Sequence, residues 1–181
     1  KKFQTSNIVP KTAALYGGLK YNLSPQTLEE ESKMYDKTEL SWIYRSEYGK
    51  EGFKDLSKSK VEIQKIAQTL SGNGYKVKSY SGVKGNAESF IAMSGKSPSI
   101  LHVATHGFYY TPDEADKYDY LNGYSDAMSL SGLVFSGGNA AWLGKEIPSG
   151  VLGGILTARD IANLDFKGTD LVMLSACKTA Q

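Results

Sequence analysis

Cysteine is scarce in this chain, with the single residue Cys177 among 181. An internal disulfide needs two cysteines, so a disulfide-stabilised fold is excluded, and a lone cysteine favours a reducing compartment. Long apolar runs are missing too, because no stretch approaches the ~18 apolar residues that cross a bilayer. Residues 1–4 lack the apolar run of a signal peptide. We therefore expect a cytoplasmic protein without a membrane partner, unless a leader peptide has been removed.

An excess of charge of one sign is also missing. The chain carries 21 basic and 19 acidic residues, a net charge of +2, which gives no electrostatic reason to expect nucleic-acid binding. Metal ligands are few, with two histidines, one cysteine and no helical H-x-x-x-H pattern, so we expect neither a metal nor a cofactor. The glycine-rich stretches 137–139 and 150–154 match no phosphate-binding pattern and predict flexible loops.

The hydrophobic pattern predicts a single domain of alternating strands and helices. The expected strands are 12–19, 75–80, 99–105, 130–135 and 170–175. The expected helices are 61–70, 86–93, 158–164 after the N-cap Thr157, and one that starts after the N-cap Ser24 with Pro25 in its first turn. Residues 108–128 are expected to form a long exposed loop, and residues 137–139 a turn. This order is typical of an α/β fold with a mostly parallel sheet covered by helices.

Two residues with catalytic potential follow the ends of predicted strands. His106 and Gly107 come after strand 99–105, and Cys177 comes after strand 170–175. The carboxyl ends of parallel strands meet at one edge of a sheet, where ligands bind, so the two segments could face one cleft. Taken separately, each residue is more often structural: a histidine satisfied by hydrogen bonds, or a buried cysteine that only packs. We expect His102, in the middle of its strand, to be a core residue covered by a helix.

Four segments of the chain match known family motifs. Residues 101–108 (LHVATHGF) follow the pattern "HxATHG" at a strand end, and residues 171–179 (LVMLSACKT) follow "LVVLSACET". Between them, residues 131–135 and 154–158 follow "SGL" and "DGxLTA". In these segments the chain resembles the CHAT family of caspase-like proteins, bacterial relatives of caspases and separases. The resemblance covers about residues 59–181, the expected catalytic core. Residues 1–58 would add an N-terminal strand and a poorly matched insertion.

The resemblance implies a caspase-like three-layer sandwich and a catalytic pair made of His106 and Cys177. It also implies an oxyanion hole formed by the backbone N–H groups of Gly107 and Cys177. Gly153, Lys178 and Ala180 depart from the family's usual residues, which bears on substrate preference more than on the chemistry. Only four residues follow Cys177, so we expect a downstream segment or a second chain to complete the sheet.

The expected activity is that of a cysteine endopeptidase, which hydrolyses peptide bonds in a polypeptide substrate through a thioester acyl-enzyme. A non-catalytic interaction module and a thiol hydrolase acting on small molecules are the alternatives. The substrate-binding residues stay unassigned. The sequence does not decide among the acidic residues of the loops, which are Asp113, Asp116, Asp119 and Asp126.

Overall fold

The computed structural model describes residues 11–35, 51–115 and 126–176. In these residues the strands form two sheets. The first is parallel, in the order β2-β1-β3-β7, and consists of Lys76–Gly82, Thr12–Leu19, Ile100–Ala104 and Leu171–Ser175. The second is antiparallel, in the order β4-β5-β6, and consists of His106–Tyr109, Ser131–Val134 and Ile155–Thr157. The mixed α/β class and the parallel main sheet confirm the prediction.

The centre of the parallel sheet is apolar on both faces. β1 pairs with β2 on one side and with β3 on the other. Leu15 and Tyr16 of β1 are both 0% exposed, although successive side chains of a strand point to opposite faces. A strand that reads as a continuous apolar run, with both faces covered, is what a parallel sheet between helices requires.

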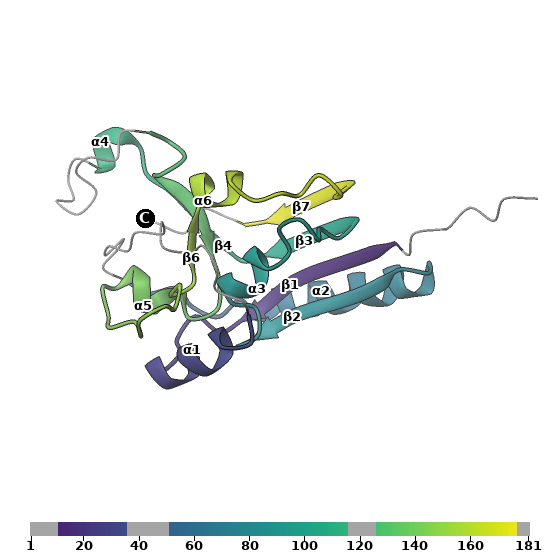
Figure 1. Cartoon of the computed structure of the whole chain (residues 1–181), viewed down its shortest axis with the longest axis horizontal. Helices are drawn as coiled ribbons and strands as arrows, with labels where there is room; N and C mark the ends of the chain where they lie inside the picture. The colour runs from purple at the N-terminus through teal and green to yellow at the C-terminus, as the bar shows by residue number, and fades with distance from the viewer. Residues whose placement is uncertain (1–10, 36–50, 116–125, 177–181) are drawn as a thin grey trace, which may run out of the picture.

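Helices cover the two faces of the parallel sheet (Figure 1). On one face α2 (Ser57–Gly72) packs Ile63 against Leu15. Gly17 permits this close approach, because a Cβ there would lie 2.7 Å from Cγ2 of Ile63. On the other face lies α3 (Ala87–Ile91), and the ring centroid of its Phe90 is 5.7 Å from that of Tyr16. This arrangement of layers is compatible with the expected caspase-like fold.

The predicted helix starts are capped as expected. Ser24 precedes α1 (Pro25–Ser32) and its hydroxyl accepts the N–H of Thr27 at 3.1 Å. Thr157 precedes α6 (Ala158–Ala162) and forms a capping box with Asp160. In each case one or two backbone N–H groups that the helix leaves unpaired find a partner.

Two segments differ from the prediction. Residues 106–109, partly assigned to an exposed loop, form β4, and the short helix α4 (Pro112–Ala115) follows in the same stretch. Residues 137–139 were expected to form a turn, but α5 (Gly138–Trp142) starts there, after Gly137 with φ +82°. Tertiary packing explains the difference, since Trp142 is 3% exposed and its ring lies 4.5 Å from that of Phe53. A short β6 was not predicted either, because three residues carry too little pattern to be recognised.

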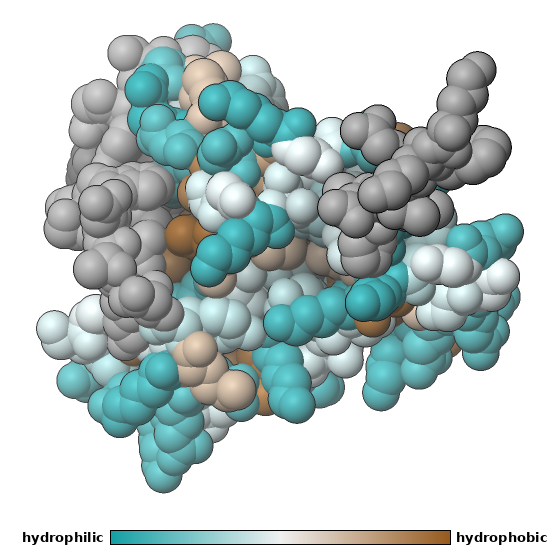
Figure 2. All heavy atoms as spheres, turned by 45° about the vertical axis from the view of Figure 1, so that its right-hand side comes forward, coloured by the Kyte–Doolittle hydropathy of each residue, from teal (hydrophilic) through white to brown (hydrophobic). Residues whose placement is uncertain are grey.

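Among the described residues, exposed large apolar side chains occur singly along the sequence, with one exception. Figure 2 shows a face on which hydrophilic residues predominate and apolar residues form separate spots. The exception is β7, where Leu171 to Leu174 are each 47–60% exposed. No helix in the described part of the chain is long and apolar enough to cross a membrane.

Candidate active site

The two strand ends singled out in the sequence lie side by side. β3 and β7 are parallel neighbours, with Ala104 paired to Ser175. One residue further on, the N–H of Thr105 donates to the carbonyl of Ser175 at 3.2 Å. A Cβ on Gly107 would lie 3.5 Å from the Cβ of Ala176. Cys177 itself lies outside the described residues. Ala176, the residue before it, lies next to Gly107.

His106 is the first residue of β4 and is almost enclosed, at 6% exposed. Aromatic rings surround it, with the centroid of Tyr21 at 4.9 Å and that of Phe53 at 5.0 Å. Its Nε2 lies 2.7 Å from the carbonyl oxygen of Lys54. A carbonyl can only accept a hydrogen bond, so Nε2 carries the proton and donates it. The nitrogen left for exchanging a proton with another group is Nδ1.

Burial lowers the pKa of His106 below the usual 6.5, because the enclosed site disfavours the charged imidazolium. The hydrogen bond to the carbonyl of Lys54 acts in the opposite direction and is the smaller effect. His106 is therefore neutral at pH 7. A neutral imidazole whose Nε2 is protonated can accept a proton at Nδ1, which is the property that a general base needs.

The main-chain N–H of Gly107 points away from β5. Paired residues of an antiparallel ladder alternate between hydrogen-bonded and non-hydrogen-bonded pairs. The N–H of Tyr110 donates to the carbonyl of Leu130 at 2.8 Å, which makes that pair a hydrogen-bonded one. Counting back along the register, the pair of Gly107 and Leu133 is of the other kind. The N–H of Gly107 is thus directed to the side of β4 opposite β5.

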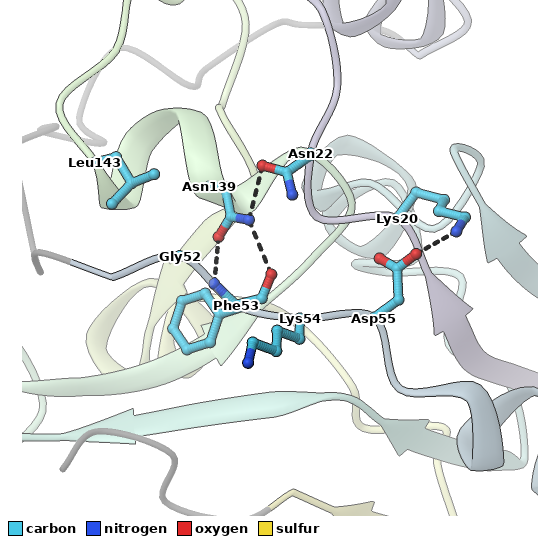
Figure 3. Close-up of a pocket in the computed structure, with 8 residues that line it drawn as sticks. All are labelled: Lys20, Asn22, Gly52, Phe53, Lys54, Asp55, Asn139 and Leu143. Atoms are coloured by element: carbon cyan, nitrogen blue, oxygen red, sulfur yellow. Dashed lines mark hydrogen bonds and ion pairs between the residues drawn. The ribbon is translucent and has the colours of Figure 1, made fainter.

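A short segment that the sequence analysis did not single out covers His106. We call residues 51–55 the strap. The buried amide of Asn139 holds it: Oδ1 accepts the N–H of Phe53 at 2.7 Å, and Nδ2 donates to the carbonyl of Phe53 at 2.9 Å (Figure 3). The indole N–H of Trp142 donates to the carbonyl of Glu51 at 2.9 Å. Because these contacts join residues far apart in sequence, no local pattern could have indicated them.

A polar cavity of about 680 Å³ is lined by residues 52–55 of the strap, by Lys20 and Asn22 just after β1, and by Asn139 and Leu143 in and after α5 (Figure 3). Lys20, next to β1, and Asp55 of the strap form an ion pair in its wall. Both side chains are about half exposed, so this pair contributes little to stability. The amide of Asn139 also reaches this wall, where Nδ2 donates to Oδ1 of Asn22 at 3.0 Å.

Of the other candidate residues, the structure describes His102, Asp113 and Asp126. His102 is 2% exposed and its Nε2 lies 2.9 Å from a carboxylate oxygen of Glu62 in α2, which confirms it as a core residue under a helix. Asp126 pairs with Arg159 at 2.9 Å, and Asp113 is exposed in α4. Asp116 and Asp119 lie outside the described residues. Within the described ranges no three His, Cys, Asp or Glu residues gather in a way that could hold a metal ion.

Comparison with known proteins gives one positive result. The family model described as "CHAT domain" matches residues 22–181. No curated protein and no solved structure matches the chain. The matched region starts before residue 59 and so includes the strap as well as both strand ends. The division of the chain at residue 58 stays a prediction.

Proposed function

Because this chain belongs to the CHAT domain family, a caspase-like family, we propose that it is a cysteine endopeptidase with Cys177 as nucleophile and His106 as acid–base partner. One observation carries the proposal. A buried, neutral histidine has its Nε2 proton fixed by a backbone carbonyl, at the edge of the sheet where the chain enters its single cysteine.

The proposed reaction uses one proton carrier throughout. Nδ1 of His106 takes the proton of the Cys177 thiol, and the thiolate attacks the scissile carbonyl carbon. The C–S bond forms, the C–N bond breaks, and Nδ1 returns the proton to the leaving amine. In the second half, Nδ1 of His106 takes a proton from water and the hydroxide attacks the thioester carbon. The C–S bond breaks, Nδ1 returns the proton to the Cys177 thiolate, and the carboxylic acid leaves.

Two main-chain N–H groups are proposed to stabilise the oxyanion that forms in each half. They belong to Gly107 and Cys177. The N–H of Gly107 is directed away from β5, and Ala176, the residue before Cys177, lies close to Gly107. A donor placed at a developing oxyanion contributes roughly 2.7–4 kcal/mol to transition-state stabilisation.

We further propose that a polypeptide strand, from a downstream segment or a second chain, extends the parallel sheet beyond β7. In the described residues β7 pairs with β3 and with no other strand. Side chains on both of its faces are exposed, and all four from Leu171 to Leu174 are apolar. An apolar edge strand of this kind is a template for further pairing. A 181-residue chain that hydrolyses peptides by itself while the β7 amides exchange rapidly with solvent would contradict this proposal.

The alternative is a caspase-like interaction module without catalysis. The exposed apolar edge of β7 is the observation that favours it, because such a surface serves association whether or not Cys177 reacts. The two proposals differ in what they require of His106, since only a peptidase depends on its exchange of protons.

The test is covalent labelling by a panel of peptide acyloxymethyl ketones, followed by intact mass. We compare the wild type with His106→Gln, which keeps an amide donor near Lys54 but has no basic nitrogen, and with Cys177→Ala as the blank. Single labelling of Cys177 that His106→Gln weakens at least tenfold supports the peptidase, and the preferred peptide reports the substrate class. Equal labelling of wild type and His106→Gln, matched by iodoacetamide, would favour the interaction module.

A further inference from the structure

Asn139 makes more contacts than a residue at a helix start needs. Its side chain is buried, with the residue 2% exposed, and every hydrogen-bonding group of its amide is used. Oδ1 accepts from the N–H of Phe53, while Nδ2 donates to the carbonyl of Phe53 and to Oδ1 of Asn22. The backbone of Phe53 is thus gripped at both its N–H and its C=O by one planar amide. Lys54, whose carbonyl accepts the proton of His106, is the next residue.

The position of Asn139 is itself fixed. Its own N–H donates to the carbonyl of Tyr21 at 3.1 Å, and the N–H of Gly137 donates to the carbonyl of Lys20 at 2.9 Å. These two bonds attach the start of α5 to the chain just beyond β1. Asn139 therefore connects the strap to the chain that leaves the parallel sheet.

Gly52 shows how closely the strap approaches this amide. A Cβ at Gly52 would lie 3.0 Å from Nδ2 and 3.1 Å from Oδ1 of Asn139. Such contacts are tighter than side chains normally allow, so a larger residue would push the strap away from the amide. The strap and Asn139 fit each other at the residue before Phe53 as well as at Phe53.

We propose that Asn139 is a positioning residue for His106. By holding the backbone of Phe53, it places the carbonyl of Lys54 where it accepts the Nε2 proton of His106, and so leaves Nδ1 as the nitrogen that can accept a proton. Asparagine suits the role because it offers one acceptor and two donors on one plane. An aspartate would keep the acceptor for the N–H of Phe53 but would face the carbonyl of Phe53 without a proton. The positioning itself stands on geometry, and only its consequence for Cys177 rests on the proposed peptidase function.

The experiment observes the imidazole directly. The chain has two histidines, so selective ¹⁵N labelling of histidine gives two rings to follow by NMR. We expect the Nε2–H proton of His106 to be protected from exchange with water, because it is buried and hydrogen-bonded. His102 is the internal reference, since its Nε2 contacts Glu62 and has no connection to the strap.

Three variants test the role. Asn139→Asp removes both donors, and Gly52→Ala crowds the same contact while leaving Asn139 intact, so the test survives if one variant fails to fold. Asn22→Ala is the matched control, because it removes only the third contact of the amide, at an exposed residue. We expect exchange of the Nε2–H proton of His106 to become about tenfold faster or more in the first two variants. This is the change in the opening equilibrium that corresponds to the loss of one hydrogen bond. It should be unchanged in Asn22→Ala, and His102 should be unchanged in all three.

The result that overturns the inference is a folded Asn139→Asp or Gly52→Ala protein in which the Nε2–H of His106 stays as protected as in the wild type. The rate and pH profile of Cys177 alkylation, measured on the same samples, separate this inference from the proposed function. Faster Nε2–H exchange with unchanged alkylation would support Asn139 as a positioning residue and contradict the Cys177–His106 pair. Faster exchange with slower alkylation supports both.

Discussion

Nε2 of His106 donates to the main-chain carbonyl of Lys54 at 2.7 Å, so a backbone atom, and not a side chain, orients the imidazole. A carboxylate in that place would raise the pKa of His106 and favour its charged form. A neutral carbonyl does so only weakly, and burial lowers the pKa overall. The ring is thereby held in one orientation and remains uncharged at neutral pH.

The lowered pKa predicts how stability depends on pH. In the unfolded chain His106 takes up a proton as the pH falls through about 6.5, whereas the folded protein resists protonation until a lower pH. The unfolded state therefore binds more protons in this window. As the pH decreases through it, the free energy of unfolding falls by up to about 1.4 kcal/mol for each pH unit. Well above pH 6.5 neither state binds this proton, and the contribution is constant. Urea unfolding at pH 8 and pH 5 should show a larger loss for the wild type than for His106→Gln, and equal losses would contradict the assignment.

Tyr21 is predicted to stabilise the site through its hydroxyl. The hydroxyl of Thr105 donates to the carbonyl of Val134, so the 2.9 Å contact between Tyr21 and Thr105 must use the proton of Tyr21. Tyr21→Phe should lower the free energy of unfolding by about 1 kcal/mol, the net value of one hydrogen bond, while the ring stays against His106. Tyr75→Phe, at a half-buried ring beneath Lys11, is the control and should change stability by less than about 0.5 kcal/mol. Equal losses of unfolding free energy in the two variants would show that the hydroxyl of Tyr21 makes no special contribution to stability.

The sequence was sufficient to predict the part of the site that depends on strand order. The apolar run 99–105 and the final run 170–175 both became parallel strands, and their register brings the segments after them together. The strap could not be predicted in this way. Its contact with His106 spans 52 residues and its contact with Asn139 spans 86, so it depends on tertiary packing that leaves no periodic signal. For the same reason the polar, glycine-containing stretch around Asn139 was interpreted as a turn.

Two glycines of the antiparallel sheet should respond differently to alanine. A Cβ at Gly107 would meet the carbonyl oxygen of Gly132 at 3.4 Å and the Cβ of Ala176 at 3.5 Å, close to ordinary van der Waals contact. A Cβ at Gly132 would lie 2.7 Å from the ring of Phe108 and would collide with the carbonyl of Leu156. Overpacking of this kind costs typically 1–3 kcal/mol. Thermal unfolding should therefore show a clear loss for Gly132→Ala and less than about 1 kcal/mol for Gly107→Ala.

The apolar edge of β7 predicts self-association of the 181-residue chain when no partner strand is supplied. Val172 and Leu174 share one face of the strand and are 52% and 60% exposed, so lysines at both positions bury no charge. The free energy of unfolding of Val172→Lys/Leu174→Lys should stay within about 0.5 kcal/mol of the wild type per substitution, as expected for surface changes. Lysines on an edge strand oppose pairing with another chain, so sedimentation should show association for the wild type and monomers for the variant.

A matched pair on the exposed face of α2, Lys58→Glu/Lys65→Glu, should leave association unchanged. Association that persists in the β7 variant would place the interface elsewhere, and the proposed extension of the sheet beyond β7 would lose its main support.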